Sequence, residues 1–183
     1  MTEFIFWFSL AGLFYIYLGY PLLVNVLARL SPMRRERHPV DQKVSLVIAC
    51  HNEAERIHKK LSELFQSTQT SLIDEVLIGS DGSVDRIAES VAALNDPRVR
   101  LIEFSERRGK PAVLNDLIPQ CRNGIVVLCD ARQILSDDAI PELLANFADS
   151  AVGVVSGELM FRQSSSDSTA GRGIGAYWRY EKM

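Results

Sequence analysis

The sequence predicts an α/β fold, with a mainly parallel sheet flanked by helices and preceded by one transmembrane helix. Two observations predict it. Short apolar runs alternate with segments of helical periodicity from residue 43 onward, and a long uncharged stretch opens the chain. Runs that are apolar throughout are typical of strands buried on both faces, as in parallel sheets. Regular strand and helix alternation puts a ligand site beyond the carboxyl ends of the strands.

The opening stretch is long enough to cross a membrane. Phe4–Ala28 has no charged residue, and as a helix it would extend about 37 Å, against a hydrocarbon core of roughly 30 Å. Its length and the acidic Glu3 speak against a cleaved signal peptide. By the positive-inside rule, the basic residues that follow keep this flank in the cytosol: Arg29, Arg34, Arg35, Arg37 and Lys43. We therefore expect a single-pass protein of the inner (plasma) membrane with a cytosolic globular part.

Local composition and the positions of proline, glycine and serine residues divide the chain into four expected parts. Residues 1–30 are the anchor, 31–42 a basic juxtamembrane linker, 43–160 the domain, and 161–183 a flexible loop with the start of a helix. The formal charge of −3 gives no basic field, so nucleic acid is not expected as a partner. The three cysteines lack CxxC spacing and are expected as buried core residues of a reducing compartment.

The domain reads as repeated strand and helix units. Five strands are predicted, at Val44–Cys50, Asp74–Ser80, Val99–Phe104, Ile125–Cys129 and Val152–Gly157. The first helix is expected to start at Asn52 in a capping box with Glu55. The others are expected at Val84–Leu94, at Pro111–Ile118, and after a Ser136 cap up to Phe147.

Polar side chains follow three of these strands, where a parallel sheet would put its site. His51, Asn52 and Glu53 follow the first strand, Asp81 and Asp85 flank the turn after the second, and Asp130 follows the fourth. Each has a purely structural interpretation as well, as a helix cap, a turn residue or a residue of a first helical turn. Taken singly, none of them is specific.

Four segments taken in order carry a family resemblance. Residues 44–53, 80–85, 108–115 and 128–132 resemble the motifs of the family-two glycosyltransferases, inverting enzymes with a GT-A fold. The apolar span with its Tyr-Pro pair is similar to the anchors of processive membrane members. The resemblance implies sugar transfer, with inversion, from a nucleotide-diphosphate donor to a saccharide or lipid-linked acceptor. The expected process is cell-surface polysaccharide synthesis at the membrane.

The resemblance also implies roles for individual residues. Ala49, His51, Glu53 and Asp81 are expected to line the pocket of the donor's base. Lys110 is expected near the diphosphate, although a lysine at a helix start can also be merely solvated. Asp130 corresponds to the first carboxylate of the family's Asp-x-Asp signature, expected at the ribose and at a divalent cation, Mg²⁺ or Mn²⁺.

The sequence departs from the family pattern at Arg132, in the position of the second carboxylate. An arginine cannot ligate a cation, so metal dependence is left open. Either Arg132 turns away and leaves the ion to Asp130 and the diphosphate, or it contacts the diphosphate itself.

The catalytic base and the acceptor motif are expected beyond Met183, so no catalytic residue is predicted within the chain. We expect donor binding without competent transfer by this polypeptide alone. The alternative is a truncated or degenerate donor-binding fragment without independent catalysis. A dinucleotide-binding dehydrogenase domain would need a Gly-x-Gly-x-x-Gly turn, and residues 50–53 do not supply one.

Overall fold

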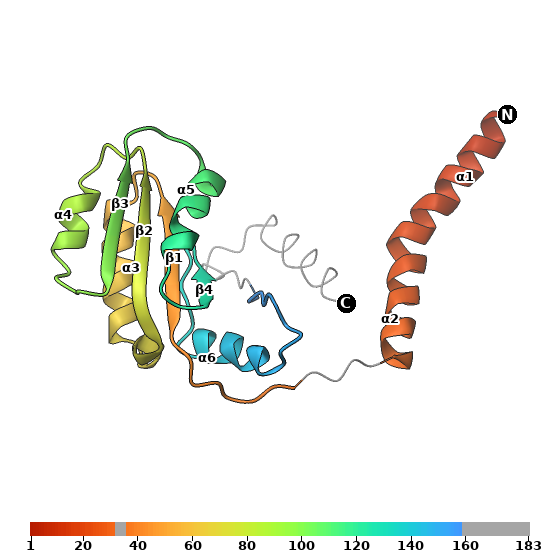
Figure 1. Cartoon of the computed structure of the whole chain (residues 1–183). Helices are drawn as coiled ribbons and strands as arrows, with labels where there is room; N and C mark the ends of the chain where they lie inside the picture. Colours follow the sequence, from red (N-terminus) through yellow and green to blue (C-terminus); the bar gives the residue numbers. More distant parts are fainter. Residues whose placement is uncertain (32–35, 159–183) are drawn as a thin grey trace, which may run out of the picture. The chain divides into compact units, whose positions relative to one another are not determined.

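The computed structural model describes residues 1–31 and 36–158 (Figure 1). They belong to two units, an N-terminal helix and a globular unit that spans residues 36–157, and each is described by itself. The predicted flexible loop and helix start at 161–183 lie outside the described residues. So do residues 32–35 of the predicted linker.

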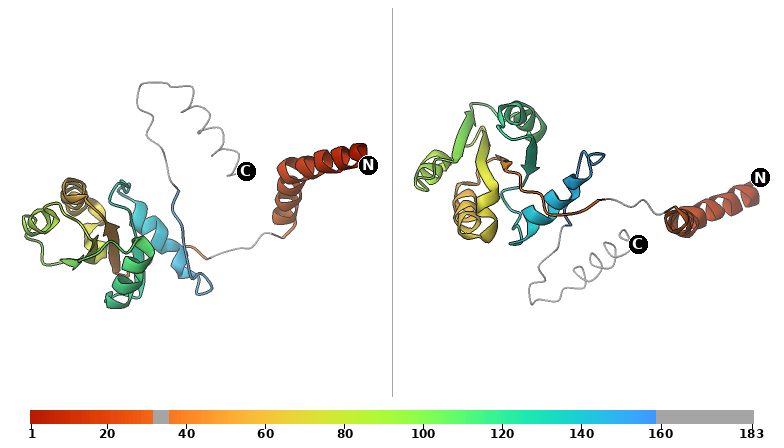
Figure 2. Two further views of the ribbon diagram at one scale, coloured as in Figure 1. Left: turned by 90° about the horizontal axis from the view of Figure 1, so that it is seen from above. Right: turned by 60° about the horizontal axis from the view of Figure 1, so that its bottom comes forward.

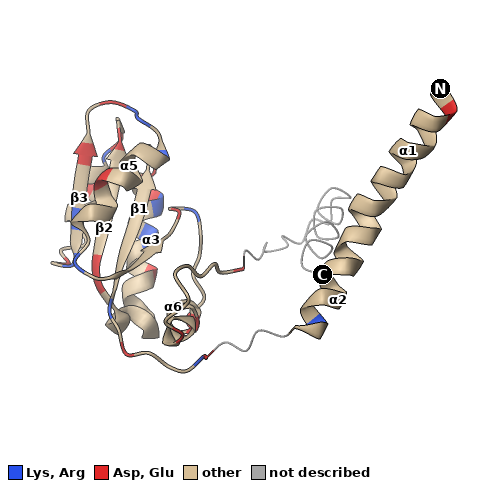
Figure 3. Cartoon of the chain, turned by 45° about the vertical axis from the view of Figure 1, so that its right-hand side comes forward, with Lys and Arg blue, Asp and Glu red and all other residues tan. Residues whose placement is uncertain are grey.

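The N-terminal unit is one helix, long and apolar enough to cross a membrane. The ribbon of this helix is almost entirely in the colour of uncharged residues in Figure 3, and within residues 2–30 only Glu3 and Arg29 carry charge. A π-helical turn lies directly before Pro21, whose missing N–H forces the ladder of hydrogen bonds to adjust. The N-terminal helix has three parts, which are α1 (Thr2–Phe14), the π-helical turn (Tyr15–Gly19) and α2 (Tyr20–Leu30).

The globular unit is built on four parallel strands in the order β3-β2-β1-β4. The strands are β1 (Val44–Cys50), β2 (Ile73–Asp81), β3 (Val99–Phe104) and β4 (Ile125–Leu128). The helices are α3 (Ala54–Gln66), α4 (Ile87–Ala92), α5 (Lys110–Leu117) and α6 (Ala139–Leu144). Short 3₁₀ turns follow α3, α5 and α6, at Thr68–Leu72, Ile118–Gln120 and Ala145–Ala148. The prediction of a parallel α/β layer is confirmed.

Helices cover both faces of the sheet, which explains why β1 is buried along its whole length (Figures 1 and 2). Alternate side chains of the strand, such as Leu46 and Ile48, enter a core formed with α3, α4 and α6. Those between them, Val47 and Ala49, enter a second core under α5. Because side chains alternate along a strand, two apolar cores favour apolar residues at consecutive positions, as from Leu46 to Cys50.

The close approach of α5 to the sheet depends on Gly79 in β2. A Cβ atom there would lie 2.3 Å from Cγ1 of Val113 and 2.8 Å from Cδ1 of Leu117. Overpacking of a filled core costs about 1–3 kcal/mol, and we expect Gly79→Ala to lower the free energy of unfolding by that amount. Gly124→Ala is the matched control, since a Cβ there has no atom within 4 Å. Equal urea midpoints for the two variants would contradict the close packing.

Three local predictions are wrong. Residues 152–158 form no strand, and Val154 is 87% exposed, so this run does not add to the core. Helix α3 begins at Ala54 without a side-chain cap from Asn52 or its neighbours. Helix α6 begins at Ala139, and Ser136 contributes its backbone carbonyl to that turn instead of a side-chain cap.

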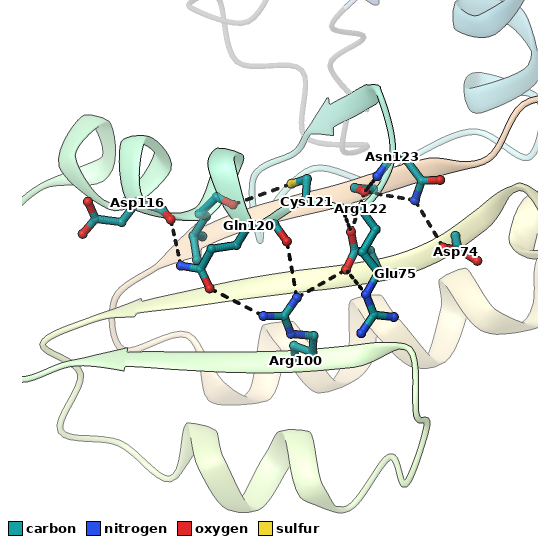
Figure 4. Close-up of polar contacts among 10 residues, drawn as sticks. Asp74, Glu75, Arg100, Asp116, Gln120, Cys121, Arg122 and Asn123 are labelled. Atoms are coloured by element: carbon teal, nitrogen blue, oxygen red, sulfur yellow. Dashed lines mark hydrogen bonds and ion pairs between the residues drawn. The ribbon is translucent and has the colours of Figure 1, made fainter.

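A buried carboxylate organises the edge of the sheet where the strands begin (Figure 4). Glu75 has no exposed surface, and its Oε1 accepts hydrogen bonds from Ser45 Oγ at 2.7 Å and from the backbone N–H of Arg122. Its Oε2 lies 3.5 Å from Arg100 Nη1 and 3.6 Å from Arg122 Nε. Asn123 also donates to Ser45 Oγ. Glu75 therefore ties β1, β2 and β3 to the segment that leads into β4.

Candidate functional site

The loops after β1 and β2 are joined by their own polar groups. Asn52 has a positive φ of 55°, and its side-chain oxygen accepts the N–H of Val84 at 2.9 Å. Its backbone N–H donates to Ser83 Oγ at 3.1 Å. The first N–H of α3, from Ala54, donates to Asp85 Oδ2 at 2.8 Å. The helix start is thus capped by a carboxylate from the neighbouring loop, which fixes both loops beyond the strand ends.

His51 extends this network. Its Nδ1 lies 2.7 Å from the backbone oxygen of Asp81, which can only accept, so the Nδ1–H group donates this hydrogen bond. Its Nε2 lies 3.2 Å from the side-chain nitrogen of Asn52 and accepts there. Both contacts are satisfied by a neutral ring that carries its proton on Nδ1.

Asp81 holds the loop between β3 and α5. It is 4% exposed, and its two oxygens accept the backbone N–H groups of Arg108, at 2.6 Å, and Gly109, at 2.8 Å. Gly109 has a φ of 88°, which an L side chain rarely adopts. We call residues 105–110 the basic loop, and Asp81 is its anchor.

The turn after β2 lies directly against the basic loop. Gly82 has a φ of 62°, and a Cβ atom there would lie 2.7 Å from the backbone nitrogen of Arg107. Its own N–H donates to the carbonyl of Phe104 at 3.1 Å. The Asp-Gly pair therefore supplies both an acceptor for the loop and the space for it.

Glu53 is a buried carboxylate between two arginines. Its Oε1 lies 2.8 Å from Nε and 2.6 Å from Nη2 of Arg132, and its Oε2 accepts from Arg56. Hydrogen bonds from Arg56 and then Arg132 lower the pKa of Glu53, although burial opposes them. The same contact raises the pKa of Arg132. The ion pair joins the end of β1 to the loop after β4.

Lys110 and Asp130 form a second ion pair near the first. Lys110 Nζ lies 3.4 Å from Asp130 Oδ2, and both side chains are about half exposed. The backbone N–H of Asp130 donates to the side-chain oxygen of Gln133, which closes the turn after β4. Both ends of this pair are thus open to a ligand in solution.

These elements surround one cavity of about 340 Å³ at the carboxyl edge of the sheet. A volume of this size is at the lower end of small-molecule sites. Six of the seven predicted donor-binding residues line it, and Asp81 lies outside the lining. The lining residues are Ala49, Cys50, His51, Glu53, Arg107, Lys110, Asp130, Ala131 and Arg132.

Three lining residues were not predicted, namely Cys50, Arg107 and Ala131. Arg107 reaches the cavity because Asp81 fixes the neighbouring part of the basic loop. In the sequence, its place in the run Arg-Arg-Gly-Lys was the one signal that could have marked it as a lining residue. Cys50 is a buried core residue, as predicted, and burial raises the pKa of its thiol to about 12. A thiol with that pKa is not a nucleophile at neutral pH.

A larger hollow of about 530 Å³ lies on the other side of Glu53. It is lined by three carboxylates, from Glu53, Glu55 and Asp85, together with Arg56 and Arg86. One oxygen of Asp85 is buried there and has no hydrogen-bond partner within the described ranges 1–31 and 36–158. This acidic lining is unsuited to a diphosphate, so the smaller cavity is the better candidate.

The smaller cavity does not form a two-carboxylate metal site. Asp130 is paired with Lys110, Glu53 is held by two arginines, and Arg132 stands where the family pattern has its second carboxylate. Among residues 1–31 and 36–158, no group of three or more His, Cys, Asp or Glu side chains is placed to hold a metal ion. The donor set therefore does not fit a divalent cation held by the protein's own carboxylates.

Curated relatives of the chain are polysaccharide synthases. Poly-β-1,6-N-acetyl-D-glucosamine synthase of Staphylococcus aureus strain COL is 31% identical over 125 residues, which is 67% of this chain and 30% of the relative. The synthase of the same name from Staphylococcus epidermidis is 28% identical over 138 residues, 74% of this chain and 33% of the relative. The chain thus spans about a third of the length of these relatives.

A solved structure shares the fold. The mannosyltransferase PcManGT from Pyrobaculum calidifontis, in complex with GDP-Man and Mn²⁺, matches with a TM-score of 0.65 and 27% identity. The match covers 78% of this chain and 44% of that one. The GT-A fold implied by the four motifs is therefore confirmed.

The family model described as glycosyl transferase family 2 matches residues 45–181, most of the chain. This range contains β2 to β4, all of β1 except Val44, and every residue that lines the cavity. The chain belongs to the glycosyl transferase family 2.

Proposed function

We propose that this chain binds a nucleotide-diphosphate sugar as the donor half of an inverting glycosyltransferase of cell-surface polysaccharide synthesis. The supporting observation is the cavity at the carboxyl edge of the sheet, lined by six residues that the family motifs single out. In the full reaction an acceptor hydroxyl loses its proton to a base. Its oxygen then bonds to the anomeric carbon as the bond to the diphosphate breaks. The acceptor is a saccharide or a lipid-linked saccharide.

The residues take separate parts in this proposal. Ala49, His51 and Glu53 lie at the base side of the donor, and Asp130 lies at the ribose. Lys110 and Arg132 lie at the diphosphate, where positive charge stabilises the leaving group. Asp81 supports the site through the basic loop, and its direct contact with the base stays a prediction. No step is assigned to a divalent cation, because the carboxylates present do not fit one.

We also propose that the N-terminal helix anchors the protein in the inner (plasma) membrane. A single helix of 29 residues with an apolar window supports the anchor. The basic residues after it support a cytosolic location for the globular unit, where nucleotide sugars are available. A polymer made at this membrane would then start from a cytosolic donor.

Calorimetric titration of UDP and of GDP into the full chain in detergent micelles tests donor binding. The curated relatives are named as synthases of an N-acetylglucosamine polymer, and the similar solved structure contains GDP-Man. The titration therefore tests a uracil nucleotide and a guanine nucleotide. We expect saturable binding of one nucleotide, weakened about tenfold in Asp130→Ala by loss of a charge-assisted hydrogen bond. Glu63→Ala, on the exposed face of α3, should bind as the parent does.

A folded chain that binds neither nucleotide would contradict the proposal. Binding that Asp130→Ala leaves unchanged would remove the cavity as its location. Circular dichroism on each variant shows whether the chain has kept its fold.

A further inference from the structure

We propose that the cavity binds the donor's diphosphate without a divalent cation, using the side chains of Arg107, Lys110 and Arg132 in its place. This inference rests on the proposed function, since it concerns the same cavity and the same class of donor.

The first argument is the charge of the lining. Three cationic side chains face two carboxylates around the cavity, and one carboxylate, Glu53, has an additional cation in Arg56. A diphosphate gains negative charge as it leaves, and that charge must be met by cations or by preorganised N–H donors. Arginine and lysine side chains supply both.

The second argument is the position and hydrogen bonding of Arg132. Its Nε and Nη2 lie 2.8 and 2.6 Å from the same oxygen of Glu53, which fixes the plane of the guanidinium. Within the described part of the chain, Nη1 makes no hydrogen bond. The planar fork of an arginine matches phosphate oxygens, so the remaining N–H groups are available to a diphosphate.

The third argument is the double support of Glu53. Because Arg56 binds Oε2, the carboxylate keeps a cationic partner when Arg132 shares its donors with a ligand. A buried carboxylate that lost its only partner would oppose such sharing. Glu53 can therefore orient Arg132 while the guanidinium contacts phosphate.

The fourth argument concerns the carboxylate that a metal would need. Asp130 Oδ2 lies 3.4 Å from Lys110 Nζ. After the contact with Glu53, the negative charge of Asp130 also helps to raise the pKa of Arg132. A divalent cation at Asp130 would meet two cationic side chains, and like-charge repulsion would weaken its binding. The same two cations attract a diphosphate.

Titration of UDP, or of GDP if that nucleotide is bound, in the presence of Mg²⁺, Mn²⁺ or EDTA tests the inference on the full chain. We expect the parent's affinity to change by less than about twofold among the three conditions. Arg132→Gln should weaken binding about tenfold or more in all of them, since it removes a charged donor. Lys59→Gln, which removes one positive charge from the exposed face of α3, should bind as the parent does.

Arg132→Asp gives a second readout. It restores the family's pair of carboxylates, and we expect this variant to bind the nucleotide with Mg²⁺ or Mn²⁺ present but not in EDTA. If Arg132→Gln does not fold, Lys110→Gln replaces it, and the same EDTA-insensitive loss is expected.

Different outcomes remove different proposals. Parent binding that disappears in EDTA would overturn the metal-free site and leave donor binding intact. Normal affinity in Arg132→Gln would overturn the role of Arg132. A folded parent that binds neither UDP nor GDP in any condition would overturn the proposed function, and this inference with it.

Discussion

Asp81→Asn is expected to lower nucleotide affinity about tenfold or more, although Asp81 does not line the cavity. Both oxygens of the native carboxylate accept backbone N–H groups, from Arg108 and Gly109. An amide of the same shape has one oxygen, so its NH₂ group must face one of these donors. The basic loop would lose its anchor, and Arg107 and Lys110 would lose their positions at the cavity. A fall of about 1–3 kcal/mol in the free energy of unfolding should accompany the loss.

The anchoring role differs measurably from a direct contact with the base. If Asp81 acts through the loop, the affinity for the bound nucleotide should fall without a change in the preference between UDP and GDP, and the amides of Arg108 and Gly109 should exchange hydrogen faster. If Asp81 reads the base, the preference between UDP and GDP should change while the exchange of these amides stays the same. Asp116→Asn is the matched control, since its half-exposed carboxylate pairs with the side chain of Arg108 and, among the described residues, accepts no backbone N–H of the basic loop.

The sequence predicted those parts of the fold that depend on local pattern. β1 was predicted at its observed bounds because all of its residues except Ser45 are apolar, and a strand covered on both faces favours that pattern. The edges of β2 and β4 differ from the predicted ones by one residue. Six candidate residues were found because family motifs mark the carboxyl ends of strands, where a parallel sheet gathers its site.

Features set by contacts distant in the chain could not be predicted. The first N–H of α3 binds Asp85, 31 positions away from Ala54, so the local capping box had a competitor that the sequence does not reveal. The Glu53–Arg132 pair spans 79 positions. The motif marks Asp81 as a site residue, but it does not show that both carboxylate oxygens accept the backbone N–H groups of Arg108 and Gly109.

Glu75→Ala is expected to produce the largest loss of stability, about 3 kcal/mol. The side chain is fully buried at the start of β2, and its removal leaves the hydroxyl of Ser45 and the N–H of Arg122 without their acceptor. The arginines themselves are partly exposed and can turn to water. The cost therefore comes mainly from the buried neutral donors and from the cavity that is left. Urea unfolding of the full chain in nonionic detergent, followed by far-UV circular dichroism, measures it.

Two further variants separate charge from position. Glu75→Gln keeps the shape and one acceptor oxygen but faces the arginines with an NH₂ group, so an intermediate loss is expected. Glu63→Ala removes an exposed carboxylate of α3, and its free energy of unfolding should stay within about 0.5 kcal/mol of the parent's. If Glu75→Ala were as stable as Glu63→Ala, the buried cluster would not contribute to stability.

The loss should also reach the cavity at the opposite edge of the sheet. Glu75 holds the segment that enters β4, a strand of four residues that pairs with β1. The turn that carries Asp130 and Arg132 begins within two residues of the end of this strand. A short strand loosened at its start has few other bonds to fix its end, so Glu75→Ala should also weaken UDP or GDP binding. Gly79→Ala, which strains the core under α5 but leaves the hydrogen bonds of Glu75 in place, provides the comparison at similar stability. Unchanged nucleotide affinity in a destabilised Glu75→Ala variant would show that β4 is held by β1 alone.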